Sequence, residues 1–352
     1  MRNGGSENQL SLFPQDKNLK LEVCPSSLPE QERPSPVESE AVIAGLNEHI
    51  EAVGKMYQAC VDCLEHSYGL DGIDARIRLH FVRLDGNGEP RFRELAECLV
   101  RHVINYSLDA RRRGTPHEPG DYIALFTQAR DLFRHSRESG ESGELLLYFL
   151  LESVLGAPQV VCKMGLKTHR QDEIKGADAL HMKWNTQARQ LEVYFGEAKL
   201  HQSFSGALSD ALAGIEKFER ERKKGLEFGL ITSNFKLLDS EIQRAVLEFV
   251  TDLSPKANYR VTHACLIGYD WAQYKHLDTD RRKRFISEFK AKYRREGELI
   301  QGKLAKKLAE AKHRKLSYEF FFIPFKSVQE FRDAFYDVLF GVNRDHGPTS
   351  AS

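Results

Sequence analysis

The sequence of 352 residues has no apolar run long enough to cross a bilayer, which takes about 18 consecutive residues. Residues 2–9 are polar, where a secretory signal peptide would have an apolar core. The six cysteines are scattered without the spacing of a disulfide framework, and the Cys60-Val-Asp-Cys63 motif has no second CxxC beside it. These absences predict a cytoplasmic protein that touches no membrane and keeps Cys60 and Cys63 as reduced thiols on one helix.

Three common catalytic motifs are also missing. The chain contains neither the GxxxxGK[ST] loop that binds nucleotide phosphates, nor GxSxG, nor HExxH. We therefore expect that the chain does not hydrolyse ATP itself, and we expect neither a serine hydrolase of the GxSxG type nor a zinc protease of the HExxH type.

The net charge is zero, but the charged residues are unevenly distributed along the chain. Lysine plus arginine and aspartate plus glutamate number 51 each, yet residues 281–315 hold 14 basic and 4 acidic side chains. Four acidic side chains are too few to form ion pairs with fourteen basic side chains along a helix. One interpretation is a helix that follows the DNA backbone, with Arg281, Arg282, Lys283 and Arg284 as phosphate contacts. The alternatives are an acidic partner protein or the acidic remainder of this chain.

Periodicity predicts an α/β fold, a mixed β-sheet flanked by helices. We divide the chain into a flexible N-terminal segment 1–37, a helix-rich region 38–135, an α/β core 136–341 and a tail 342–352. The helical pattern covers 38–66, 92–108, 121–134, 144–155, 205–224, 238–252, 278–315 with interruptions near Gly297 and Gly302, and 328–341. The strand pattern covers 75–84, 160–167, 179–184, 191–199, 228–235, 259–269 and 316–325.

The two neighbouring strands 179–184 and 191–199 carry the candidate site. If they pair as a hairpin across the polar turn 185–189, Asp178 lies opposite the far end of the second strand. Glu197 and Lys199 extend the apolar face of that strand, because side chains two residues apart point the same way. Two carboxylates and an ammonium group would then meet where the strand ends.

This arrangement matches what phosphodiester hydrolysis needs. Mg²⁺ is held by one or two carboxylates while it keeps waters and substrate phosphate oxygens. A lysine beside it can orient the attacking water or stabilise developing charge. Glu144, in the first turn of the helix at 144–155, has two compatible interpretations. It suits the positive end of the helix dipole, or it completes the metal site.

The Gly176-Ala-Asp178 and Gly196-Glu-Ala-Lys199 motifs resemble those of the PD-(D/E)xK nuclease superfamily, with alanine at a position where proline is common. With the upstream segment GELLLYFLLESVLG, the chain resembles the HamA family, the nuclease effectors of Hachiman anti-phage defence. The resemblance implies a restriction-endonuclease-like core. It also implies a metal-dependent DNA endonuclease that uses Mg²⁺, or Mn²⁺ in its place, bound by Asp178, Glu197 and Glu144. Lys199 would complete the catalytic set.

The same resemblance implies a partner, a HamB-like superfamily 2 helicase whose engagement of DNA releases the nuclease. The rival hypothesis is a catalytically silent nuclease-fold subunit that only binds DNA or regulates. The intact set of Asp178, Glu197 and Lys199 favours the enzyme, because a binding role alone does not require it. Nothing in the sequence resembles a recognition helix with a base code, so we expect little sequence specificity.

Overall fold

The computed structural model describes residues 56–161, 164, 178–185, 187–188, 190–222, 259–277, 282–310 and 313–342. The predicted N-terminal segment 1–37, the strand at 228–235 and the helix at 238–252 lie outside the described residues, as does the tail beyond Val342. No helix within the described ranges combines the length and the hydrophobicity needed to cross a membrane.

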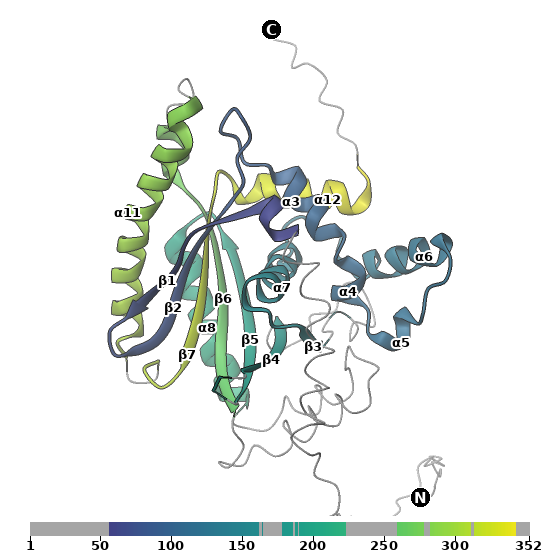
Figure 1. The fold of residues 1–352 in the computed structure, drawn as a ribbon, viewed down its shortest axis with the longest axis horizontal. Coiled ribbons are helices and arrows are strands. Elements are labelled where there is room, and N and C mark those ends of the chain that lie inside the picture. Colours follow the sequence, from purple (N-terminus) through teal and green to yellow (C-terminus); the bar gives the residue numbers. More distant parts are fainter. Residues whose placement is uncertain are drawn as a thin grey trace, which may run out of the picture.

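A sheet of seven strands forms the centre of the molecule, in the order β1-β2-β7-β6-β5-β4-β3 (Figure 1). The pairs β2–β7, β7–β6 and β6–β5 are parallel, and the pairs β1–β2, β5–β4 and β4–β3 are antiparallel. The strands are β1 Val61–Leu70, β2 Ile73–Val82, β3 Gln159–Val161, β4 Ala179–Asn185, β5 Gln190–His201, β6 Tyr259–Asp270 and β7 Ser317–Phe325. The predicted mixed sheet is therefore confirmed, and it takes strands from both sides of residue 135.

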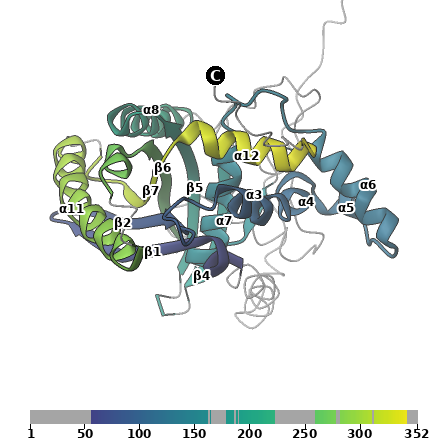
Figure 2. The same cartoon turned by 90° about the horizontal axis from the view of Figure 1, so that it is seen from above.

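Helices cover both faces of the sheet, as Figures 1 and 2 show from two directions. One face carries α3 Phe92–Val100, α4 Val103–Ser107, α7 Glu141–Leu155 and α12 Val328–Phe340. α5 Ala110–Arg113 and α6 Pro119–Arg130 extend beyond α4, away from the sheet (Figures 1 and 2). The other face carries α8 Phe204–Arg222 and α11 Arg282–Leu308, and the 3₁₀ turn η2 Ala272–His276 follows β6. Each face has its own apolar core, because alternate residues of β6 and β7 point to opposite sides.

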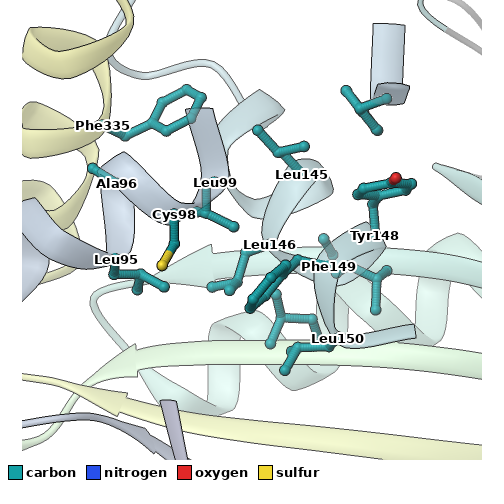
Figure 3. Packing of buried hydrophobic residues seen from close by; sticks show 14 of the residues in the cluster. Leu95, Ala96, Cys98, Leu99, Leu145, Leu146, Tyr148, Phe149, Leu150 and Phe335 are labelled. Atoms are coloured by element: carbon teal, nitrogen blue, oxygen red, sulfur yellow. The ribbon is translucent and has the colours of Figure 1, made fainter. Parts of the chain in front are cut away.

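The α7 helix is the centre of the first of these cores. Its residues Leu145, Leu146 and Phe149 are completely buried, and they lie beside Leu95 and Leu99 of α3 (Figure 3). A helix with apolar residues on every side is stable in a folded protein when other elements bury it on every side. The continuous apolar run at 144–155 thus has a packing cause, and it fixes the N-terminal end of α7 against the sheet.

Three expectations from the sequence are wrong. Residues 61–66, expected in a helix, belong to strand β1, which pairs with β2. Cys60 is disulfide-bonded to Cys98 of α3 instead of being a reduced thiol, and Cys63, which retains its thiol, lies on β1 instead of a helix. The α11 helix runs without a break through Gly297 and Gly302, although glycine weakens a helix interior.

Candidate active site

The hairpin of β4 and β5 forms with the predicted geometry. Ala179 pairs with Gly196, and the two strands remain in register down to their turn. Just before β4, the backbone N–H of Asp178 donates to the Gly196 carbonyl oxygen at 2.9 Å. The Asp178 carboxylate accepts a hydrogen bond of 3.0 Å from the Ala198 N–H. Asp178 is therefore fixed against the end of β5 by its own backbone and by its side chain.

Glu197 and Lys199 lie beside Asp178 and form an ion pair. The Lys199 Nζ atom is 2.7 Å from Glu197 Oε1, and the two side chains are 29% and 14% exposed. They point to the face of the sheet that α8 covers. A Cβ atom placed on Gly214 of α8 would collide with Glu197 Oε1, so the absence of a side chain at Gly214 gives the carboxylate its room. The role of Gly214 has no signal in the sequence pattern.

The charge around Lys199 is dominated by carboxylates. Burial lowers the pKa of Lys199, but the negative charges of Glu197, Asp178 and Glu144 outweigh burial and raise that pKa above its usual value. The side chain is therefore an ammonium ion at neutral pH. Lys199 can stabilise negative charge or orient a water molecule, but it is not poised to accept a proton.

Glu144 lies in the first turn of α7, in the layer on the other side of the sheet, and its charge acts on Lys199. The hydroxyl group of Tyr106 in α4 donates to Glu144 Oε2 at 3.2 Å. The helix approaches β5 closely here, because a Cβ on the neighbouring Gly143 would lie 3.0 Å from the side chain of Leu200. Tyr106 thus orients a predicted site residue from a distant part of the sequence, and nothing in the sequence motif indicated it.

These side chains are suited to a hard cation that needs few protein ligands. Among the described residues no group of three or more His, Cys, Asp or Glu side chains has the mutual spacing of a metal site. Mg²⁺ does not require such a cage, because it is often held by one or two carboxylates together with water and substrate phosphate. Asp178 and Glu197, fixed on adjacent strands, fit that limited requirement.

The predicted phosphate contacts lie at and just before the start of α11. Arg281 lies outside the described residues, and Arg282, Lys283 and Arg284 form the first turn of α11, with side chains that also lie outside them. Further along α11, Arg295 and Lys306 are exposed. Lys303 lies over the ring of Phe204, its Nζ 4.8 Å from the centroid, and so connects α11 to the start of α8.

A family model described as HamA matches residues 59–339, which include every described strand and helix from β1 to most of α12. No curated protein matches the chain. The matched range contains Glu144, Asp178, Glu197 and Lys199.

Proposed function

The chain belongs to the HamA family, and from this premise we propose that it is a metal-dependent DNA endonuclease of the PD-(D/E)xK type acting in anti-phage defence. The observation that carries the proposal is that Asp178 and Glu197 are held at the same end of the β4–β5 hairpin, with the Lys199 ammonium 2.7 Å from Glu197. The negative charges of Asp178 and Glu144 also act on Lys199. Such an excess of carboxylates over bases favours the binding of a further cation. In DNA cleavage, a cation at this place would neutralise charge on the scissile phosphate and activate the attacking water.

Each residue has a defined part in this proposal. Asp178 and Glu197 would hold Mg²⁺, or Mn²⁺ in its place, and Glu144 would assist directly or through a water molecule. The ion supplies charge neutralisation at the scissile phosphate and a more acidic water. Lys199, being an ammonium ion, orients the attacking water and stabilises negative charge that develops on the phosphate. Asp178 is kept in position by the Ala198 N–H.

The proposed substrate contact is made by the basic residues of the segment 281–315, with Arg281, Arg282, Lys283 and Arg284 at its start. Replacing these four residues by alanine is expected to weaken DNA binding equally for all sequences. It should also reduce the dependence of affinity on salt by about one unit of slope per lost contact. An unchanged slope would point to a protein partner instead.

A second function is favoured by one specific contact. Glu197 Oε1 already has the Lys199 ammonium at 2.7 Å, so the carboxylate is engaged without a metal ion. A nuclease-fold subunit that binds DNA or regulates a partner, without cleaving, would retain this ion pair as a structural feature. The two functions differ in one observable, the cleavage of DNA in the presence of Mg²⁺.

The experiment uses purified protein and supercoiled plasmid, with Mg²⁺ or with a chelator. Cleavage that requires the metal and is lost in Glu197→Gln supports the nuclease. The matched control is Glu192→Gln, which removes a carboxylate from the same strand at the other end of the hairpin. Equal cleavage by wild type and Glu197→Gln would overturn the assignment of the site.

We further propose that a HamB-like helicase restrains the nuclease. The chain has no nucleotide-hydrolysing motif with which to time its own activity, and a nuclease without sequence specificity endangers its host. Co-expression with a neighbouring helicase gene followed by size exclusion should give one complex. Separate elution at low and moderate salt, together with full cleavage by the nuclease alone, would contradict this proposal.

A further inference from the structure

One edge of β5 continues past the end of its neighbour. β4 starts at Ala179, which pairs with Gly196, so Ala198 and Leu200 lie beyond the paired part of the hairpin. Within a strand, the N–H and C=O groups of one residue point to one edge and those of the next residue to the other edge. Gly196 and Ala198 both point towards β4, since both bond to Asp178. The Leu200 carbonyl therefore points to this same edge.

Arg332 of α12 occupies the edge at Leu200. Its Nη2 atom donates to the Leu200 carbonyl oxygen at 2.9 Å. Leu200 lies two residues beyond Ala198, about 7 Å of extended strand. Among the described residues, this edge thus carries the carboxylate of Asp178 at one position and a guanidinium group at the next. Lys199 lies between Ala198 and Leu200 in the sequence.

The guanidinium group of Arg332 is only partly used by the protein. Its hydrogen bond to Leu200 is the one that it makes within the described part of the chain, and its buried Nε–H has no acceptor there. An arginine carries five N–H donors in a fixed fork. No carboxylate of the described residues lies within ion-pairing distance of it, although Glu138 and Asp270 are close enough for their charges to act on it.

Burial also acts against the charge. It lowers the pKa of Arg332, an effect larger than the opposing influence of Tyr336, Glu138 and Asp270. A guanidinium group remains charged at neutral pH regardless, because its ordinary pKa exceeds about 12. A half-buried cation with unused donors is stabilised by an anion that accepts from its fork.

We propose that Arg332 binds a backbone phosphate of the DNA next to the scissile phosphate, as a substrate-binding residue of the same active site. This inference rests on the proposed nuclease function. Asp178 and its metal would hold the scissile phosphate, and Arg332, one strand repeat further along the same edge of β5, would hold its neighbour. Arginine suits this task, because its planar fork binds phosphate oxygens in pairs.

A purely structural role would have a different signature. If Arg332 serves only to fasten α12 to the Leu200 carbonyl, its removal should lower thermal stability and leave the salt dependence of DNA binding unchanged. Arg137 provides a matched control. It contacts the same helix, but its charge is paired with Asp333, at 3.2 Å, and with Asp337.

The test measures binding of a labelled DNA duplex, and of the corresponding single strand, by fluorescence anisotropy at several salt concentrations. Glu197→Gln serves as the background in which the DNA stays intact. Arg332→Gln is expected to weaken binding about tenfold and to reduce the slope of log K against log salt by about 0.9 for duplex or about 0.7 for single strand. Arg332→Lys should retain most of the slope but less of the affinity, because it keeps the charge and loses the fork.

The control Arg137→Gln should lower the melting temperature and leave the slope as in the background protein. An Arg332→Gln protein with the background slope would overturn the inference, and so would a loss of slope in Arg137→Gln equal to that in Arg332→Gln. The readout is binding and not cleavage. If wild type fails to cleave but Arg332→Gln loses slope, the nuclease function is wrong while Arg332 remains a phosphate contact.

Discussion

The two ends of the β4–β5 hairpin carry the same pair of residue types in different surroundings. At the turn end, Lys183 Nζ lies 3.2 Å from Glu192 Oε2. The Glu192 carboxylate also accepts hydrogen bonds from Asn185 at 2.7 Å and from the Tyr194 hydroxyl at 2.5 Å. One acid faces one base there, and neutral donors occupy the remaining acceptor positions. This pair is complete as it stands.

At the open end, Lys199 pairs with Glu197 at 2.7 Å, but Asp178 and Glu144 act on the same ammonium group. The negative charges of three carboxylates thus act on one ammonium group. A lysine–glutamate pair within a sheet therefore does not by itself indicate a functional site. A structural ion pair has neighbours that leave its total charge near zero. A candidate cation site has further carboxylates nearby that leave the total charge negative.

The largest expected difference between the two ends of the hairpin is the loss of DNA cleavage when a glutamate is replaced. Glu197→Gln should reduce DNA cleavage about 10³-fold, because loss of a metal ligand removes several kcal/mol of charge stabilisation and each factor of ten is about 1.4 kcal/mol. Glu192→Gln should change cleavage by less than about threefold. Plasmid cleavage rates under single-turnover conditions measure both. Similar losses in the two variants would mean that the hairpin ends do not differ in function.

The two lysines give the next largest difference. Lys199→Met should reduce cleavage about 10²-fold, in the range for a group that assists proton transfer or charge development. Lys183→Met removes the pair with Glu192 and the hydrogen bond to the Leu155 carbonyl oxygen, 3.1 Å long, so it should lower stability and leave the rate of cleavage nearly unchanged. Cleavage assays combined with thermal melting separate these effects. Loss of cleavage in Lys183→Met at temperatures well below its melting point would contradict the comparison.

For the free energy of unfolding we expect the opposite order, with the larger loss from replacing Glu192 at the turn end. Burial raises the pKa of Glu192, but the hydrogen bonds from Tyr194 and Asn185 and the charge of Lys183 outweigh it and leave the pKa lowered. A lowered folded-state pKa means that Glu192 contributes stability above its unfolded pKa and loses that contribution as pH falls through the folded value. Glu192→Gln should therefore cost about 2 kcal/mol at pH 7 and progressively less below about pH 4. Urea unfolding across this pH range measures the difference, and a constant cost would contradict it.

The smallest effect concerns the room around Glu197. Gly214→Ala should displace the Glu197 carboxylate and slow cleavage about tenfold, since small misplacements of reacting groups are costly. Gly302→Ala is the control, because a Cβ at Gly302 in α11 meets no atom within 4 Å. It should stabilise the helix by about 0.5–1 kcal/mol and leave cleavage unchanged. Unaltered cleavage in Gly214→Ala would show that the contact has no functional weight.

Much of this fold was predictable from period alone. β5, β6 and β7 are apolar strands bounded by turns, α7 is a long apolar run and α12 has clear helical spacing, so the sequence predicts each of them to within a few residues. Residues 61–66 of β1 were expected in a helix because they continue the helical spacing of apolar residues that begins at residue 38. The extended form of β1 depends on pairing with β2, a tertiary effect that local pattern does not contain. The Cys60–Cys98 disulfide joins residues 38 positions apart, and spacing gave no sign of it.

The site divides in the same way. Asp178, Glu197 and Lys199 lie on one hairpin, so short-range register was enough to bring them together before the structure was known. Tyr106, Gly214 and Arg332 come from three separate helices, and only the packing of those helices against α7 and the sheet places them near the site. Residues that act through local geometry can be read from sequence, whereas those that depend on layer packing cannot.

The most direct test of the central claim is the position of a bound metal ion. Crystals grown with Mn²⁺ would give an anomalous difference peak. We expect a peak about 2.0–2.5 Å from carboxylate oxygens of Asp178 and Glu197, with Lys199 turned away from Glu197, and none at the turn end beside Glu192. A peak at Glu192, or well-ordered Asp178 and Glu197 side chains with no peak between them, would contradict the account.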